Sequence, residues 1–259
     1  MTELKAIIFD VDGTLANTEE AHRIAFNYAF EQAGLSWNWD VELYTKLLKV
    51  TGGKERIRFY VSDFLNETIA QDLVVSLHEA KNAQYQAIIK RGELPLRSGI
   101  LSLINECRAS NMKIAIATTT SPGNVTNLVA ATMGEDALGW FEYIADAESA
   151  PIKKPAPDVY EFVLDKMGLK PEETIALEDS YNGVAAATAI NIPTVITVNN
   201  YTAQDKFEGA MIVVSELGEA GDATAKCEVI NIDAKLDKAM VGDNIDLGTL
   251  KAMHKAFTN

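Results

Sequence analysis

Short apolar runs alternate with amphipathic helical patterns along most of the chain, and this alternation constrains the fold more than any other feature. Runs of strand length, each followed by a polar loop and a helical pattern, occupy residues 4–9, 113–117, 174–177, 194–198 and 210–214. Short apolar strands that alternate with helices are typical of a parallel sheet covered on both faces. We therefore predict an α/β fold with a parallel-sheet, Rossmann-like core.

One long segment interrupts the alternation. From Thr18 to about Glu93 the pattern is helical, without a convincing core strand. Thr18 is a candidate N-cap of a helix whose expected apolar face carries Ala21, Ile24, Ala25, Tyr28 and Ala29. Further helices are expected over 41–48, 54–64 and 69–91. We predict an inserted helical cap domain, 18–93, on a core made of 1–17 and 94–259.

Composition excludes several classes of partner. The formal net charge of −14 argues against nucleic acid and anionic membranes, so an anionic ligand requires a local cluster of cations or a metal. No apolar stretch approaches the roughly 18 residues of a membrane span. Two cysteines, Cys107 and Cys227, favour buried thiols in a reducing compartment. The N-terminus shows no export or transit signal. We expect a cytoplasmic protein, or one of the plastid stroma if a transit peptide has been removed, and a monomer by default.

The first strand-like run ends in two acids, Asp10 and Asp12, followed by Gly13. Residues two apart in a strand point the same way, so both carboxylates would enter the crevice at the carboxyl end of the sheet. Close carboxylates repel each other unless a hard divalent cation lies between them, and a glycine allows a sharp turn beyond. The motif predicts a metal site; a turn with solvated acids is the alternative.

Three more polar sites follow expected strand ends or precede a helix. Residues 118–121 offer threonine and serine hydroxyls for phosphate oxygens, Lys154 begins a Lys-Pro-Ala-Pro-Asp run, and Glu178 and Asp179 follow another strand. Taken singly, these are explained by a loop hydroxyl, a surface lysine and N-cap acids. In this order, together with the Asp-x-Asp-Gly-Thr motif at 10–14, they resemble the haloacid dehalogenase superfamily of phosphohydrolases.

This resemblance implies a mechanism and a set of roles. Asp10 would be the nucleophile that forms an aspartyl-phosphate, and Asp12 the general acid and later the base, with Thr118 and Lys154 completing the catalytic set. Mg²⁺ would be held by Asp10, by the main-chain carbonyl of Asp12 and by Asp179, with Glu178 in or beside the shell. The resemblance also implies the strand order 3-2-1-4-5. Independently of it, a carboxylate attacks phosphorus only where cations screen both charges.

The inserted helices carry candidate substrate contacts. Glu19 and His22 share a face of the first helix with Phe26, opposite its expected apolar face; a surface histidine is the alternative. The run Thr-Gly-Gly-Lys-Glu-Arg at 51–56 opens a helix with two glycines and two cations, which suits an anion. His78 and Lys81, one turn apart, could add to it. These cations suggest a second anionic group on the substrate; a solvated basic helix face is the alternative.

Four segments together are similar to the CbbY-type phosphatases of carbon-fixing organisms: 18–23, 51–56, 118–122 and 153–160. In that family the activity is removal of the 1-phosphate from xylulose 1,5-bisphosphate, which inhibits Rubisco. Ser98 departs from the family pattern, which often has proline there, and 219–246 has no recognised counterpart. His22, from its place on the first helix, and Lys154, as a charge that could neutralise phosphate, are further candidate substrate contacts. Contacts to a sugar bisphosphate are carried over by position to Glu19, Gly52, Gly53, Lys54, Glu55, Arg56, His78, Lys81, Thr118, Thr119, Thr120, Ser121 and Asn124.

Three other functions share these motifs. A sugar phosphomutase of the β-phosphoglucomutase kind has the same catalytic residues but returns the phosphate to the sugar. A broad phosphosugar or phosphoglycolate phosphatase is a further alternative. A non-catalytic phosphosugar sensor is disfavoured, because a sensor would not need the catalytic residues. This chain has all four of them: Asp10, Asp12, Lys154 and Asp179.

Overall fold

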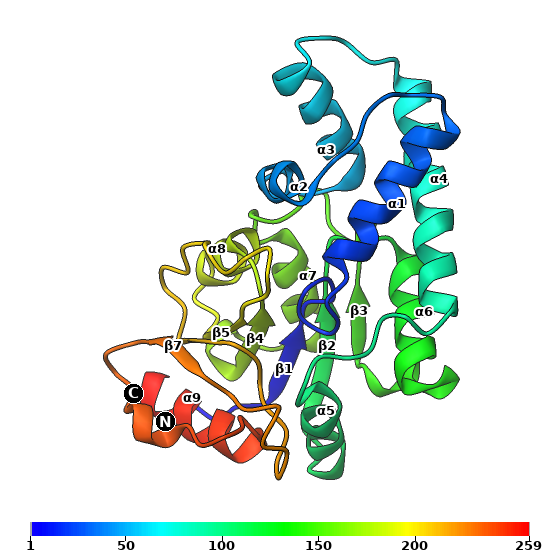
Figure 1. Ribbon diagram of the computed structural model, residues 1–259. Helices are drawn as coiled ribbons and strands as arrows, with labels where there is room; N and C mark the ends of the chain where they lie inside the picture. Colours follow the sequence, from blue (N-terminus) through cyan, green and yellow to red (C-terminus); the bar gives the residue numbers. More distant parts are fainter. Residues whose placement is uncertain (1, 259) are drawn as a thin grey trace.

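The computed structural model describes residues 2–258, and within them seven strands form one sheet in the order β3-β2-β1-β4-β5-β6-β7 (Figure 1). All neighbouring strands are parallel except β6 and β7. The predicted α/β core and the strand order 3-2-1-4-5 are confirmed. The strands are β1 (Ala6–Phe9), β2 (Lys113–Ala117), β3 (Tyr143–Ala145), β4 (Thr174–Glu178), β5 (Thr194–Thr197), β6 (Ile212–Val214) and β7 (Val229–Ile232).

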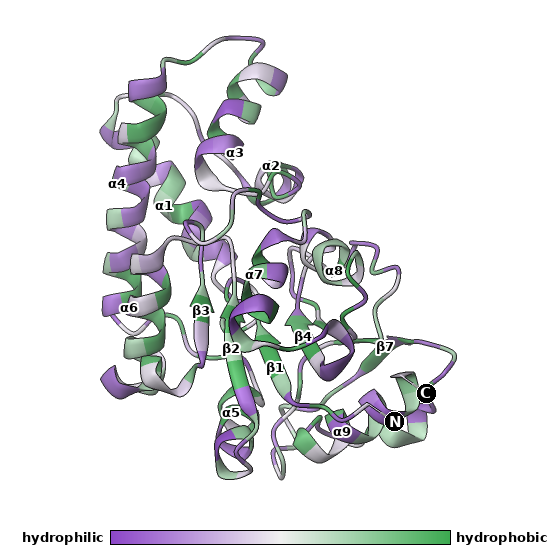
Figure 2. Cartoon of the chain, turned by 180° about the vertical axis from the view of Figure 1, so that it is seen from behind, coloured by the Kyte–Doolittle hydropathy of each residue, from purple (hydrophilic) through white to green (hydrophobic). Residues whose placement is uncertain are grey.

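The two faces of the central strands differ in side-chain size, because residues alternate between the faces. Large side chains such as Ile7, Phe9 and Ile116 pack under α5 (Ile100–Ala109), α6 (Pro122–Met133) and α9 (Leu247–Thr258). Small ones such as Ala115 and Ala117 pack under α7 (Asp158–Met167) and α8 (Tyr181–Thr188). Figure 2 shows that the strands are mostly hydrophobic and that the helices are amphipathic, with both hydrophilic and hydrophobic residues. Both faces of the sheet are therefore covered.

Between β1 and α5 the chain forms only helices, which rise above one end of the sheet in Figure 1. They are α1 (Glu19–Gln32), α2 (Val41–Leu47), α3 (Gly53–Phe59), the π-helical turn η1 (Tyr60–Phe64) and α4 (Gln71–Lys90). Aromatic side chains form a separate core there, with Phe26, Phe30, Trp39 and Tyr60 among its members. We retain 18–93 as the proposed extent of the cap.

The orientation of α1 differs from the prediction. Ile24 and Tyr28, expected on the apolar face, are 44% and 40% exposed. His22, Phe26 and Phe30 are buried instead, on the same side as the three alanines of the expected face. The large aromatic side chains of the cap core outweigh the contribution of an isoleucine and a half-polar tyrosine, and this sets the rotation of the helix.

The remaining elements lie at the edges. The short 3₁₀ turns are η2 (Glu135–Trp140), η3 (Pro171–Glu173) and η4 (Lys238–Met240). After β6 the chain adds β7, an antiparallel edge strand, and ends in α9. Strand β3 was not predicted. Cys107 and Cys227 are buried free thiols, as expected. No helix within 2–258 combines the length and apolar character that crossing a membrane requires.

Candidate active site

The floor of the candidate site is formed by Asp10, Thr118, Lys154, Glu178 and Asp179, and strand register brings most of these residues together. Phe9 of β1 is level with Ile116 of β2 and Leu177 of β4. The residues that follow these positions therefore emerge at one edge of the sheet, where open α/β sheets bind ligands.

Lys154 lies at the centre of the floor. Its Nζ donates to Asp10 Oδ1 at 2.7 Å, to Glu178 Oε1 at 2.6 Å and to the Ala117 carbonyl at 2.8 Å. Burial opposes its charge, but the two carboxylates outweigh burial and raise the pKa of Lys154. Tyr160 of α7 donates to the same Glu178 oxygen at 2.6 Å. The lysine is therefore a fixed positive charge between the two acids.

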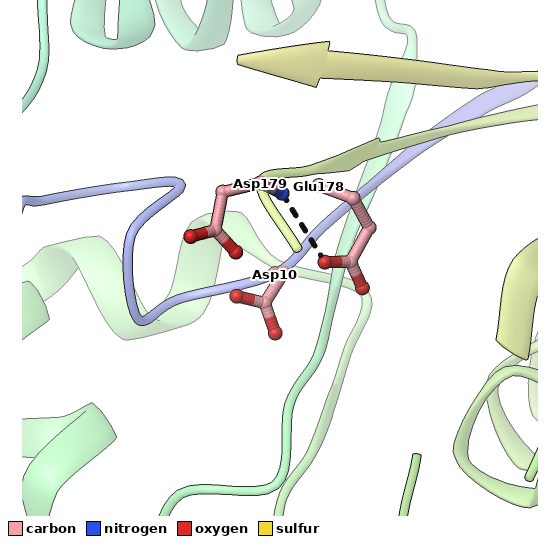
Figure 3. Close-up of side chains that lie close together, drawn as sticks. All are labelled: Asp10, Glu178 and Asp179. Atoms are coloured by element: carbon pink, nitrogen blue, oxygen red, sulfur yellow. Dashed lines mark hydrogen bonds between the residues drawn. The ribbon is translucent and has the colours of Figure 1, made fainter. Parts of the chain in front are cut away.

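Three buried carboxylates meet beside this lysine. Oxygen atoms of Asp10, Glu178 and Asp179 lie within 4.8 Å of one another (Figure 3). Burial raises the pKa of Asp10 to about 8, against the opposing charge of Lys154. Burial, followed by the charges of the other two acids, raises the pKa of Asp179 well above its usual range. An all-oxygen set of neighbouring acids fits a hard divalent cation such as Mg²⁺, which would favour the ionised forms of Asp10 and Asp179.

Gly13 keeps the space next to this cluster open. Its φ is +88°, and a Cβ there would lie 2.0 Å from Asp179 Oδ2 and 2.9 Å from Asn199 Nδ2. Only glycine fits this turn and this close approach together. The prediction that Gly13 turns the chain is borne out by this geometry.

Asp12 does not belong to the three-carboxylate cluster. Its Oδ1 accepts from Thr18 Oγ1 at 2.7 Å and lies 3.0 Å from His22 Nε2. Burial would raise the pKa of Asp12, but His22 and Thr18, with the charge of Lys81, outweigh burial and hold the pKa below its usual range. Thr18 stands at the predicted N-cap, yet its hydroxyl bonds Asp12 and makes no cap. The side chain of Asp12 is thus turned toward the cap.

The wall of the site is the cap surface that carries Glu19, His22, Lys54, Arg56, His78 and Lys81. Arg56 Nη1 donates to the Tyr44 hydroxyl at 2.9 Å, and that hydroxyl donates to Glu19 Oε2 at 2.9 Å. Within 2–258, Lys54 and Lys81 form no hydrogen bond or ion pair with the protein. Burial, with the charge of Arg56 adding to it, lowers the pKa of Lys81 to about 8. The wall therefore holds cations without protein anions bound to them.

Floor and wall enclose one cavity of about 620 Å³. All the predicted site residues line it, including residues 52–56, 118–121 and Asn124, with one exception. The exception is Glu178, which is 1% exposed and accepts hydrogen bonds from Lys154 and Tyr160. The cavity is lined by seven cations, in a chain of net charge −14: Lys49, Lys54, Arg56, Lys81, Lys153, Lys154 and Lys206.

Several residues of the site were not predicted. Tyr44 lies in the helix predicted over 41–48 but was given no role there. Lys153 was also given no role, although its Nζ pairs with Glu55 of the cap at 2.9 Å. Asn199 Nδ2 donates to Asp179 Oδ2 at 2.7 Å. A signal for Asn199 existed, since it follows a predicted strand whose carboxyl end belongs to the same edge of the sheet.

This fold and this site define a class of enzymes. A Rossmann-like sheet places an aspartate, a lysine and a second pair of acids at its carboxyl edge, beneath an inserted helical cap. The family model described as haloacid dehalogenase-like hydrolase matches residues 4–191.

Comparison with known proteins narrows this class. The CbbY protein of Cupriavidus necator, encoded on a plasmid, is 47% identical over 223 residues, 85% of this chain and 88% of the relative. CbbY of Rhodobacter capsulatus is 44% identical over 84% of this chain and 96% of the relative. The crystal structure of a CbbY variant from Rhodobacter sphaeroides with xylulose-(1,5)bisphosphate matches with a TM-score of 0.77, 40% identity and coverage of 84% and 97%. The chain belongs to the haloacid dehalogenase-like hydrolases and, among them, to the CbbY proteins; it is a phosphatase.

Proposed function

We propose that this phosphatase acts on sugar phosphates, and that its substrate is xylulose 1,5-bisphosphate, from which it removes the 1-phosphate to leave xylulose 5-phosphate. One observation carries the proposal: a buried aspartate paired with a lysine lies across a single cavity from cap cations that have no protein anion. The floor suits the phosphoryl group to be transferred. The wall suits a second phosphate on the same small molecule.

The relatives support this substrate. The Rhodobacter sphaeroides CbbY variant was crystallised in complex with xylulose-(1,5)bisphosphate, and that chain is 40% identical to this one over nearly its whole length. The cavity of about 620 Å³ is within the range of small-molecule sites. The cations of the wall add an independent physical reason to prefer a bisphosphate to a monophosphate.

In the proposed first step, Asp10 attacks the phosphorus of the 1-phosphate. Its Oδ1 is held by Lys154, which leaves Oδ2 to form the new P–O bond while the bond to the sugar oxygen breaks. The departing oxygen needs a proton, and Asp12 supplies it. A phosphate dianion beside Asp12 favours the protonated carboxyl, because a like charge raises the pKa of an acid.

In the second step, water attacks the phosphorus of the phosphorylated Asp10. Asp12, now ionised, accepts the proton of the water, and the carboxylate of Asp10 leaves as inorganic phosphate forms. Thr18 and His22 hold the ionised carboxylate of Asp12 from the cap side. The same residue thus serves as acid and then as base.

Asp10 and Asp179, with the Asp12 carbonyl and with Glu178 in or beside the shell, would hold Mg²⁺ in this proposal. When bound, the ion screens the charge between the carboxylates and the phosphoryl oxygens. Glu178 also positions Lys154 and keeps it charged. Gly183 allows this acid to approach α8, since a Cβ there would lie 1.8 Å from Glu178 Oε2.

The test is the fate of the phosphate. The full chain with Mg²⁺ is assayed for inorganic phosphate release from xylulose 1,5-bisphosphate, with β-glucose 1-phosphate and phosphoglycolate in parallel. We expect one phosphate per bisphosphate, xylulose 5-phosphate as the product, and much slower release from the other two. Isomerisation of β-glucose 1-phosphate would identify a mutase instead, and equal rates on all three would identify a broad phosphatase. No turnover at all would favour a sensor.

A further inference from the structure

Arg97 occupies a junction between the cap and the floor. It lies in the linker that returns from α4 to α5, and this linker runs beside the outgoing one: Leu96 bridges Ala16, and the Arg97 N–H donates to the Leu15 carbonyl at 2.8 Å. Arg97 therefore sits where both cap linkers meet the core.

Its guanidinium binds main-chain carbonyls of three separate segments. It donates to the carbonyl of Gly13 in the acidic loop. It also donates to Thr197, the last residue of β5, at 2.8 Å, to Val198 just after it at 2.6 Å, and to Ser215 after β6 at 2.8 Å. The residue is 9% exposed, and within 2–258 no carboxylate accepts a hydrogen bond from it. Five donors in a planar fork can satisfy such a set, whereas the three donors of a lysine on a flexible stem cannot.

Two of these segments enclose Asp179. Gly13 approaches so closely that a Cβ would collide with Asp179 Oδ2. Asn199, which follows Val198 directly, donates to the same oxygen at 2.7 Å. Arg97 thus fixes the backbone on both sides of one carboxylate of the floor. A buried cation without a bound anion is costly, and the charge of Asp179 partly compensates that of Arg97.

We propose that Arg97 is a positioning residue for the metal site: it clamps Gly13 to the end of β5, and through Asn199 it holds Asp179 ready for the divalent cation. Because Arg97 also belongs to the cap linkers, it ties the geometry of that acid to the base of the cap. This inference rests on the proposed Mg²⁺ site. Arg97 touches neither the cavity nor the reacting atoms, so it acts only through these neighbours.

The test is direct titration of the full, metal-stripped chain with Mg²⁺ by calorimetry, alongside separate kcat and KM values. For Arg97→Lys we expect the Kd for Mg²⁺ to rise about 10- to 100-fold, as is usual when the support of a metal ligand is lost. At limiting Mg²⁺, kcat should fall while KM for the sugar phosphate stays within about twofold, because the wall is untouched. Asn199→Ala, which removes no buried charge, should show the same rise in Kd.

A destabilised control separates positioning from general weakening. Leu250→Ala, in α9 and fully buried, should lower Tm without changing the Kd for Mg²⁺. Wild-type Kd in a folded Arg97→Lys chain would overturn the inference. If that variant does not fold, Asn199→Ala decides in the same way. If the wild-type chain binds no Mg²⁺, both the proposed metal site and the role of Arg97 are refuted. If wild type and both variants bind Mg²⁺ with the same Kd, only the role of Arg97 is refuted.

Discussion

The floor and the wall of the cavity are built in opposite ways. The floor lies at the carboxyl ends of parallel strands, and its single cation, Lys154, makes three hydrogen bonds inside the protein. The wall stands on helices of the cap, and Lys54 and Lys81 form no hydrogen bond or ion pair within the described chain. Because the protein itself holds Lys154 in place, the floor is preorganised for one reaction. Because Lys54 and Lys81 have no hydrogen-bonding partner in the protein, the wall is suited to bind a ligand. Chemistry and selectivity should therefore be separable by mutation.

The largest effect is expected at the floor, for Asp10→Asn. The amide keeps the shape of the side chain but cannot act as the nucleophile, so turnover should fall by roughly 10⁴- to 10⁶-fold. Phosphate release measures the loss, and circular dichroism and substrate binding verify that the fold and the wall persist. Residual activity within about tenfold of wild type would mean that another group attacks the phosphorus.

The next effect is on stability, for Lys154→Met. Two nearly inaccessible carboxylates lose their partner, and breaking a buried ion pair from one side costs about 3–5 kcal/mol. Urea denaturation measures the free energy of unfolding. Lys113→Met is the matched control, because its pair with Glu142 spans 3.6 Å at the surface and should contribute no more than about 1 kcal/mol. Equal losses in the two variants would contradict the account of the floor.

A selective effect is expected at the wall, for Arg56→Ala. Loss of a charge-assisted contact costs about 1.5–3 kcal/mol, so kcat/KM for xylulose 1,5-bisphosphate should fall about 10- to 150-fold. The value for xylulose 1-phosphate should change far less. Arg58→Ala is the control, since this neighbour binds Gln71 at 2.6 Å and does not line the cavity. Equal losses of kcat/KM on both substrates would show that the wall does not bind a second phosphate.

A smaller effect is expected for Tyr44→Phe. The ring stays in the cap core, but the hydroxyl that joins Arg56 to Glu19 is lost, which costs about 1 kcal/mol, or roughly fivefold in kcat/KM. Tyr28→Phe, on the exposed side of α1, serves as the control and should be neutral. An unchanged kcat/KM in Tyr44→Phe would mean that Arg56 is held by other contacts.

The smallest effect tests the rotation of α1. Ile24→Lys changes a 44% exposed side chain and should alter the free energy of unfolding by no more than about 0.5 kcal/mol. Phe26→Ala, one half-turn away in the cap core, should cost about 3–5 kcal/mol. Thermal and urea denaturation compare the two. A large loss of stability in Ile24→Lys would mean that Ile24 lies on the buried face of α1, as the apolar pattern predicted.

The same contrast explains how far the sequence could be read. The floor was predictable because Asp10, Thr118 and Glu178 each follow or end a recognisable apolar run, and parallel strands end at one edge of a sheet. Strand β3 escaped prediction because it has three residues and its first side chain, Tyr143, is 37% exposed. A strand so short and so open leaves little periodicity to detect.

The wall was predictable in membership but not in orientation. Helical spacing placed Glu19, His22 and Phe26 on one face, and the structure keeps them together against the cavity. Spacing alone could not reveal that this face is the buried one, because Trp39 and Tyr60 come from other segments. Arg97 had no signal at all. Its partners are backbone carbonyls, which are the same in every residue.

Trapping the phosphorylated enzyme tests directly whether Asp10 is the nucleophile. The full chain is quenched in acid during turnover of xylulose 1,5-bisphosphate with Mg²⁺, and its peptides are analysed by mass spectrometry. If Asp10 is the nucleophile, the peptide that contains it carries a phosphoryl group, and the same peptide of Asp10→Asn carries none. A phosphoryl group on another residue, or undiminished phosphate release by Asp10→Asn, would contradict this assignment.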